Sequence, residues 1–177
     1  MKGEFDFGKS FLDVLDREFP KAKIFWHEGN HCMRWERYLR VKAPILFDME
    51  EFRLSVIFRL RERGIEWIPN GQITKIGKLN AIHGNQYKGG GGINVARTIW
   101  LRAGDNVIAG DKHKVQNAIK STIDGKVYGT WSVGHLGEKN PEYLPLNEWS
   151  QGFAHITVEN NGDFTVKNYM IIDGKLH

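Results

Sequence analysis

Apolar residues recur at intervals of three and four positions in four stretches of the chain, and this spacing predicts amphipathic helices. In the first stretch Phe11, Leu12 and Leu15 share one face, and Pro20 ends the run. Such faces are expected to turn towards a core, so the four helices are predicted to pack against other elements. The predicted helices span residues 8–19, 34–41, 50–63 and 94–102.

The third predicted helix carries start and stop signals of its own. Asp48 and Glu51 have the spacing of a capping box, and Gly64 follows the last periodic residue. The polar face of this helix is rich in arginine, and we interpret it as a solvated face rather than a nucleic-acid surface. The arginines concerned are Arg53, Arg59, Arg61 and Arg63.

Short runs of β-branched and aromatic residues, bounded by Gly, Pro, Asn or Asp, predict strands in most of the remaining chain. Two pairs of runs flank the turns Asp124-Gly125 and Asn161-Gly162, which favours β-hairpins. A polar loop is expected over 134–148. The predicted strands span 22–26, 65–68, 73–76, 79–82, 106–109, 115–123, 126–133, 152–159 and 164–172, giving an α/β (α+β) chain.

The composition fits a single soluble domain over residues 1–177, with 41% hydrophobic residues to form its core. Cys32 is the single cysteine, so an internal disulfide is excluded and a reducing compartment is expected. No signal peptide and no membrane-spanning apolar run are recognisable, which predicts a cytoplasmic protein without a membrane partner. The net charge of +4 and the pI near 9.1 are compatible with a phosphate-bearing partner.

Three loops that follow predicted strands share one pattern, in which Gly lies beside His, Asn or Asp. They are Gly29-Asn30-His31, His83-Gly84-Asn85 and Gly110-Asp111-Lys112-His113. If the three strands are neighbours, the loops meet at one sheet edge and offer ligands for zinc, manganese, iron or magnesium. Two such ions about 4 Å apart suit the hydrolysis of a phosphate ester.

Other interpretations of these loops stay open. Asn30 is also placed to cap the following helix, which would leave His31 as a solvated loop residue. The four glycines at 89–92 lack the Lys-Ser/Thr of a phosphate-binding loop, so we expect the rim of a substrate cleft there. Other residues are expected to have ordinary structural roles: His27, His135, His155 and His177 as surface or strand residues, and Trp131 and Trp149 in the core.

Longer blocks surround these loops: Glu28-Gly29-Asn30-His31 with 34–39, Ile82-His83-Gly84-Asn85 with 94–97, and 109–114 with 130–134 and 149–154. The blocks resemble the calcineurin-like metallophosphoesterases, particularly phage-type and prophage-type members, over nearly the whole chain. The family pattern is Asp-x-His, Gly-Asp-x-x-Asp, Gly-Asn-His-[Asp/Glu], a lone His and Gly-His-x-His. The resemblance implies a four-layer α/β/β/α sandwich with a two-metal site at the sheet edge.

The resemblance also implies roles for individual residues. Asn30 and His83 match ligands of the second metal, and His113 matches a ligand of the first. Asp111 stands where the family has a metal-binding His, and a carboxylate binds the same ions. His31 matches the residue that protonates the leaving oxygen or stabilises the transition state. The cofactor implied is a divalent ion (manganese, zinc, iron or nickel) at one or two sites.

Some positions depart from the family pattern. Asn85 stands where phage-type members usually carry a second His, and Cys32 replaces the acidic residue that orients the catalytic His. A thiol is a poor hydrogen-bond acceptor for that purpose. With Asn85, Arg34 and Arg97 are the expected substrate-binding residues, as cationic groups suited to a phosphate ester.

The two motifs expected at the front of the family pattern are missing from this sequence. Without them the second metal keeps Asn30, His83 and Asp111, whereas the first keeps His113. The resemblance therefore implies an N-terminally truncated sandwich, with an unpaired sheet edge covered by another copy of the chain or by a complementing polypeptide.

These observations lead to three functional hypotheses. The first is a metal-dependent phosphoester hydrolase of phosphodiesterase or nuclease type, acting in a bacterial or phage-infected cell. The second is a degenerate, non-catalytic member that serves as a binding or regulatory module. The third is a nucleic-acid-binding module with a basic surface made by Arg34, Arg37, Arg40, Arg97 and Arg102.

Overall fold

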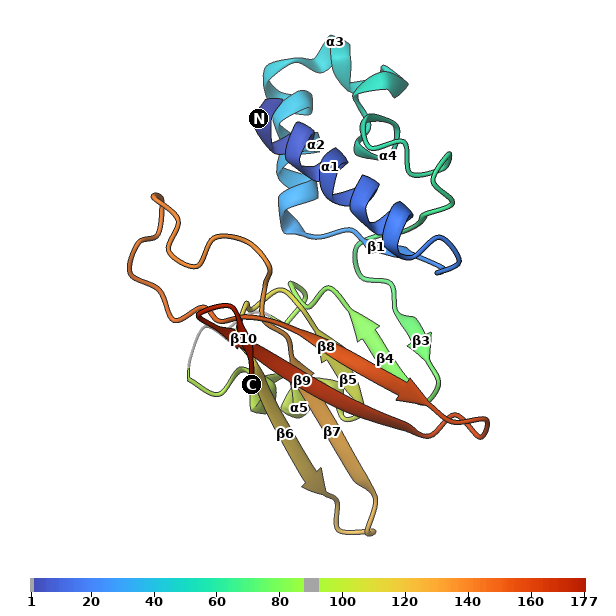
Figure 1. Cartoon of the computed structure of the whole chain (residues 1–177), viewed down its shortest axis with the longest axis vertical. Helices are drawn as coiled ribbons and strands as arrows, with labels where there is room; N and C mark the ends of the chain where they lie inside the picture. Colours follow the sequence, from blue (N-terminus) through green and yellow to red (C-terminus); the bar gives the residue numbers. More distant parts are fainter. Residues whose placement is uncertain (1, 88–92) are drawn as a thin grey trace. The chain divides into compact units, whose positions relative to one another are not determined.

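The computed structural model describes residues 2–87 and 93–177. Contacts divide the chain into two compact units, Met1–Asn70 and Gly71–His177, which we call unit 1 and unit 2 and treat one at a time. Both units contain helices and strands (Figure 1), so the predicted mixture of α and β structure is confirmed. That all 177 residues form one domain stays a prediction. Among the described helices, none has the length and apolar character needed to span a membrane.

Unit 1 combines helices with a small parallel sheet. The helix predicted from Gly8 starts earlier, at Lys2, so Gly8 lies within it. The Phe58 ring packs closely against Gly8, where an added Cβ would come 2.7 Å from Phe58 Cε1. The elements are α1 (Lys2–Glu18), β1 (Phe25–His27), α2 (Asn30–Lys42), α3 (Pro44–Phe47), the 3₁₀ helix η1 (Glu50–Phe52), α4 (Leu54–Ile57) and β2 (Glu66–Ile68), with β1 and β2 paired in parallel.

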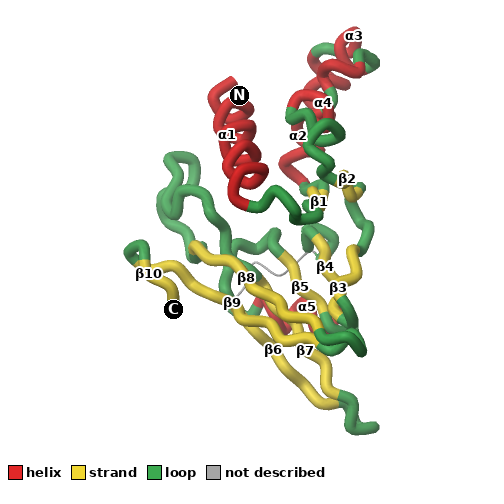
Figure 2. Tube along the Cα trace, turned by 45° about the vertical axis from the view of Figure 1, so that its right-hand side comes forward, coloured by secondary structure: helices red, strands yellow, loops and turns green. Residues whose placement is uncertain are grey.

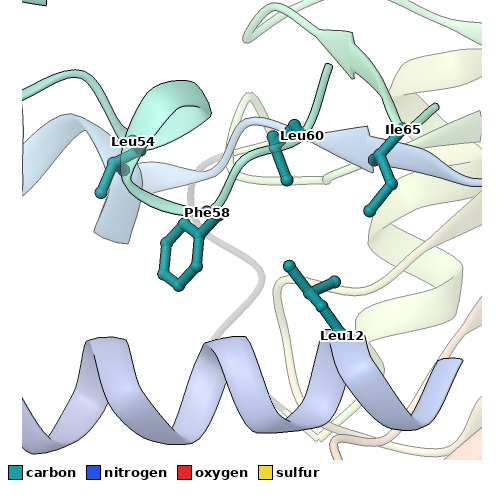
Figure 3. Packing of buried hydrophobic residues seen from close by; sticks show 5 residues of the cluster. All are labelled: Leu12, Leu54, Phe58, Leu60 and Ile65. Carbon is teal, nitrogen blue, oxygen red and sulfur yellow. The ribbon is translucent and has the colours of Figure 1, made fainter. Parts of the chain in front are cut away.

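The core of unit 1 joins α1 to the segment that follows α3. In Figure 3 the side chain of Leu12 points from α1 towards that segment. The Phe58 ring stacks on Trp26 with centroids 5.2 Å apart and meets the edge of Phe5 at 5.8 Å. Burial of each large apolar side chain contributes about 1.5–3 kcal/mol, which makes this cluster the main stabilising feature of the unit. Its buried members are Leu12, Leu54, Phe58, Leu60 and Ile65.

The prediction of a single helix over residues 50–63 is wrong. The backbone of Arg53 is extended, with ψ 137°, and separates η1 from α4. Arg59 adopts a left-handed conformation with φ 54°, so no helix continues through it. The capping box is also absent from the described residues, since Asp48 lies at the C-terminal end of α3 and η1 has no side-chain cap.

Arg63 does not lie on a solvated face as predicted. Its side chain is 16% exposed, and its guanidinium forms ion pairs with Asp13 and Asp16 of α1. Hydrogen bonding to Asp13 is the main cause that raises the pKa of Arg63 above its ordinary value. The residue therefore ties the turns that follow α4 to α1.

Unit 2 has three layers, which Figure 2 shows with strands in yellow and helix α5 (Val95–Ala103) in red. Val95 and Ile99 of α5 pack on one face of a five-stranded sheet, and Leu79, Ile108 and Trp131 pack between its other face and a three-stranded sheet. Trp131 is therefore a core residue, as predicted. The five-stranded sheet has the order β3 (Thr74–Ile76), β4 (Leu79–Ile82), β5 (Val107–Ala109), β7 (Val127–Ser132), β6 (Gln116–Ser121).

The three-stranded sheet comes from the C-terminal part of the chain. It has the order β10 (Lys175–Leu176), β9 (Phe164–Ile172), β8 (Gln151–Val158). Both predicted hairpins, β6–β7 and β8–β9, are confirmed by antiparallel pairing, whereas β10 was not predicted.

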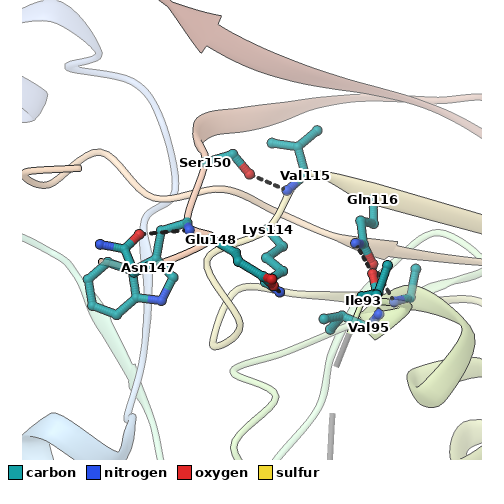
Figure 4. A network of polar contacts seen from close by, with 10 residues as sticks. Ile93, Val95, Lys114, Val115, Gln116, Asn147, Glu148 and Ser150 are labelled. Atoms are coloured by element: carbon teal, nitrogen blue, oxygen red, sulfur yellow. Dashed lines mark hydrogen bonds and ion pairs between the residues drawn. The ribbon is translucent and has the colours of Figure 1, made fainter. Parts of the chain in front are cut away.

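Helix α5 (Val95–Ala103) receives its N-terminal cap from a distant strand. Asn94 makes no side-chain cap, and Gln116 of β6 takes this role (Figure 4). The Gln116 side-chain oxygen accepts hydrogen bonds from the backbone N–H of Val95 at 2.7 Å and of Ala96 at 3.3 Å. Its amide nitrogen donates to the carbonyl of Ile93. This contact fixes the start of α5 to the sheet.

Candidate functional site

The loops that follow β4 and β5 meet at one edge of the five-stranded sheet. These strands are parallel neighbours, with Ile82 opposite Ala109. The carbonyl of His83 accepts hydrogen bonds from the backbone N–H of Gly110 at 3.0 Å and of Asp111 at 2.8 Å. Two of the three loops that were expected to meet are therefore brought together.

Gly84 permits the close approach of the two loops. Its φ of 107° is rare for any other residue, and an added Cβ would lie 3.0 Å from Ala109 Cβ and 3.3 Å from Asp111 Cβ. The backbone N–H of Gly84 donates to Gln86 Oε1 at 3.1 Å, which stabilises the turn locally.

His83 and Asp111 form an incomplete polar pair. His83 Nδ1 lies 3.6 Å from Asp111 Oδ1, which is beyond hydrogen-bond distance. This nitrogen is buried and has no hydrogen-bond partner within the described residues. The two side chains are 25% and 11% exposed, so both are mostly buried at this edge of the sheet. A buried nitrogen beside a carboxylate is a suitable pair of donors for a divalent ion.

Lys112 places a competing cation at the same carboxylate. Its Nζ lies 2.7 Å from Asp111 Oδ2, and its side chain is 18% exposed. Asp111 thus has one oxygen held by an ammonium group and the other facing His83. No pattern in the sequence predicts this ion pair, because Lys112 is the next residue and the direction of its side chain depends on the backbone turn.

His113 lies beside two aromatic side chains, those of His135 near the start of the predicted polar loop and of Trp149 just after its end. Its ring stacks on His135 with centroids 4.9 Å apart and planes inclined by 27°. The edge of Trp149 meets His113 at 4.6 Å and His135 at 5.3 Å. Backbone hydrogen bonds hold the three segments together, since Ser150 N–H donates to His113 O and His135 N–H donates to Ser150 O.

His135 was predicted to be an ordinary surface or strand residue, and its environment is more specific than that. It follows β7, the next parallel neighbour of β5. Burial lowers the pKa of its imidazole below the ordinary value, which favours the neutral ring. Trp149, predicted as a core residue, is half-buried against the two histidines.

The residues predicted from the first loop lie in unit 1. β1 pairs with β2 in a separate sheet, where Trp26 stacks on Trp67, so β1 is not one of the five strands that include β4 and β5. Gly29 is the N-cap of α2 and Asn30 is its first residue, so the alternative in which Asn30 caps the helix is wrong.

The side chains near the start of α2 differ in exposure. His31 and Arg34 are exposed, whereas Asn30 is half-buried. Cys32 packs against the hydrophobic core of unit 1, which is consistent with its apolar character. The roles assigned to Asn30, His31 and Arg34 stay predictions.

Two further candidate residues belong to unit 2. Asn85 is half-buried, and its side-chain oxygen is buried without a hydrogen-bond partner in the part of the chain that the structure describes. Arg97 lies exposed on α5. The glycines at 89–92, expected at the rim of a substrate cleft, lie outside the described residues.

The arrangement supplies two ligands for a divalent ion, which is not a complete ligand set. Over residues 2–87 and 93–177, no group of three or more His, Cys, Asp or Glu side chains is placed to hold a metal ion. His83 and Asp111 nevertheless supply an unpartnered imidazole nitrogen and a carboxylate at one edge. Further ligands would have to be water, substrate or other protein groups.

Comparison of the chain with known proteins found no matching family model and no matching curated protein.

Proposed function

We propose that the chain is a metal-dependent phosphoester hydrolase of the calcineurin-like metallophosphoesterase type, acting as a phosphodiesterase or nuclease. The observation that carries the proposal is the pair His83 and Asp111, brought together at the ends of adjacent parallel strands with His83 Nδ1 buried and unpartnered among the described residues. Ligand-binding groups gather at this end of the strands in open α/β sheets.

The proposal gives each predicted residue a chemical task. Bound divalent ions supply an activated water and neutralise charge on the phosphoryl oxygens. In unit 2, His83, Asp111 and His113 are proposed as metal ligands. In unit 1, Asn30 is proposed as a metal ligand and His31 as a group that donates a proton to the leaving oxygen. Arg34, Asn85 and Arg97 are proposed to bind the phosphate ester, with nucleic acid among the substrates considered.

The layers of unit 2 support the proposed family architecture. One helix layer, a mixed five-stranded sheet and a second antiparallel sheet follow one another, which agrees with the α/β/β part of a four-layer sandwich. In unit 1, β1 has β2 as its strand partner among the described residues, leaving one edge of β1 without a strand. We propose that a second copy of the chain or a complementing polypeptide pairs there.

The first test measures bound metal and turnover together. The purified chain is loaded separately with manganese, zinc, iron and nickel, and hydrolysis of a bis-aryl phosphate is followed. We expect stoichiometric metal, with turnover reduced by roughly 10²–10⁴ in His31→Ala, the range for loss of a general acid. His83→Ala should lose metal, whereas His155→Ala on β8 serves as the matched control, because His155 is exposed. Unchanged metal content in His83→Ala would overturn the ligand assignment.

A second candidate function is a binding or regulatory module that retains the fold without catalysis. The ion pair between Lys112 and Asp111 favours it, because the carboxylate already has a cationic partner. Cys32, packed against the core of unit 1, also leaves His31 without the acidic neighbour of the family pattern. Binding of a phosphodiester without turnover under every metal would support this candidate.

A further inference from the structure

Three adjacent parallel strands of unit 2 are each followed by a histidine. The strands β4, β5 and β7 lie side by side in parallel register. His83 directly follows β4, His113 lies in the loop after β5, and His135 lies in the loop after β7. The ends of parallel strands meet at one edge, so this topology gathers imidazoles that are far apart in sequence. The proposed function uses His83 and His113 and leaves His135 unassigned.

The spacing of the second and third histidines suits joint binding of one ion. An imidazole nitrogen lies about 2 Å from a bound zinc, so two rings that share one ion have their centres roughly 5 Å apart. The centroids of His113 and His135 are 4.9 Å apart. The His113 backbone has φ 55°, an uncommon conformation for a residue other than glycine, and it is held by the hydrogen bond from Ser150 N–H at 2.8 Å.

The surroundings of His135 leave one of its ring nitrogens available to bind a ligand. His135 Nε2 is buried and has no hydrogen-bond partner in the portion of the chain that the structure describes. Buried polar atoms in folded proteins nearly always have a partner, so a missing one calls for an explanation. Trp149 packs at a steep angle against both histidine rings, with centroids 4.6 Å and 5.3 Å away, and so holds the two rings beside each other.

We propose that His135 and His113 together bind a divalent transition-metal ion such as zinc or nickel, with water completing the coordination. Imidazole nitrogen is a preferred ligand for these ions. This inference rests on the proposed function, because it adds His135 to the ligands of the metal assigned to His113. It raises the number of protein ligands of that metal from one to two.

The test follows the side-chain nitrogens of all seven histidines by long-range ¹H–¹⁵N NMR while zinc chloride is added to the full chain. Signals are assigned with single His→Gln variants. We expect the signals of His113 and His135 to shift together at the same zinc concentration. A shift of His83 without His135 would overturn the inference and leave the proposed function standing. No histidine shift up to millimolar zinc would overturn both.

Variants at position 135 separate metal binding from packing. His135→Gln should weaken zinc binding at this pair, measured calorimetrically, by at least the roughly tenfold loss that removal of a supporting hydrogen bond to a ligand brings. His135→Cys replaces the imidazole with another zinc ligand and should restore part of the affinity. His155→Gln is the matched control on β8 and should leave zinc binding unchanged. Equal zinc affinity in His135→Gln and the wild-type chain would overturn the inference.

Discussion

Among single residues, Lys112 has the most direct influence on the candidate metal ligands. Its ammonium lies 2.7 Å from Asp111 Oδ2, and both side chains are largely buried. A divalent ion that binds Asp111 must share this carboxylate with the ammonium or displace it. Lys112 is therefore expected to lower the affinity of the site for metal.

Replacement of Lys112 tests this competition. Lys112→Met keeps the length of the side chain and removes its charge, so we expect manganese or zinc to bind about five- to tenfold more tightly, the equivalent of roughly 1–1.4 kcal/mol. Lys126→Met is the control, because Lys126 pairs with Asp124 in an exposed hairpin turn. The measurement is calorimetric titration with metal. Unchanged or weaker binding in Lys112→Met would contradict competition at Asp111.

Arg63 is the second residue whose effect can be measured separately. It forms ion pairs with Asp13 and Asp16 while its side chain is 16% exposed. We expect Arg63→Met to lower the free energy of unfolding of unit 1 by roughly 1–3 kcal/mol, since two charge-assisted hydrogen bonds are lost. Arg61→Met, at an exposed position, should change it little. Urea denaturation followed by tryptophan fluorescence measures both, and equal midpoints would contradict this role.

The sequence predicts residues of the candidate site only where a strand end can be recognised. His83 and Asp111 follow clear apolar strands, and the structure brings them together. His135 also follows a strand, but Val133 and Gly134 separate it from the strand end. A long loop comes after it, so the pattern of a strand end does not identify it. Its stacking on His113 depends on the pairing of β5 with β7, two strands that β6 separates in the sequence.

At the scale of elements, the start of α5 depends on a residue from another strand. Gln116 accepts hydrogen bonds from Val95 and Ala96 and donates to Ile93. A local search for an N-cap finds Asn94, which makes no side-chain cap. The helix was predicted correctly from its apolar spacing, but the residue that caps it lies too far along the chain for sequence rules to identify.

Two substitutions test the cap. Gln116→Ala removes the acceptor for both N–H groups and should lower the free energy of unfolding by about 1–2 kcal/mol, as for other lost caps. Gln116→Glu retains an acceptor, which the helix N-terminus favours, and loses the bond to Ile93 O, so it should cost less. Thermal and urea denaturation of both variants give the comparison. An effect of Gln116→Glu equal to or larger than that of Gln116→Ala would contradict capping by Gln116.

The segment over 50–63 shows where apolar periodicity misleads. Leu54 and Phe58 are buried and lie four positions apart, yet they belong to a short helix and to the turns that follow it. The left-handed backbone at Arg59 and the buried Leu60 and Ile65 direct the chain back over α1. Tertiary packing of this kind overrides local helix propensity, which sequence reasoning weighs residue by residue.

At the scale of the whole molecule, each of the two units has a core of its own. Unit 1 has its own core around Phe58, and unit 2 has separate clusters on the two faces of its five-stranded sheet. The sequence shows no linker between them, because the boundary at Asn70 and Gly71 lies within a short polar turn. A sequence without a compositional break was predicted to form one domain.

Calorimetry of the full chain distinguishes one cooperative domain from two. Because each unit has its own core, we expect two thermal transitions. Arg63→Met should then lower the midpoint of one transition by several degrees, and Gln116→Ala that of the other, since about 1 kcal/mol shifts the midpoint of a domain this small by roughly 4–8 °C. Each variant serves as the control for the other, because their residues lie in different units. A single transition that both variants lower would contradict this expectation. It would mean that the 177 residues unfold as the one domain predicted from the sequence.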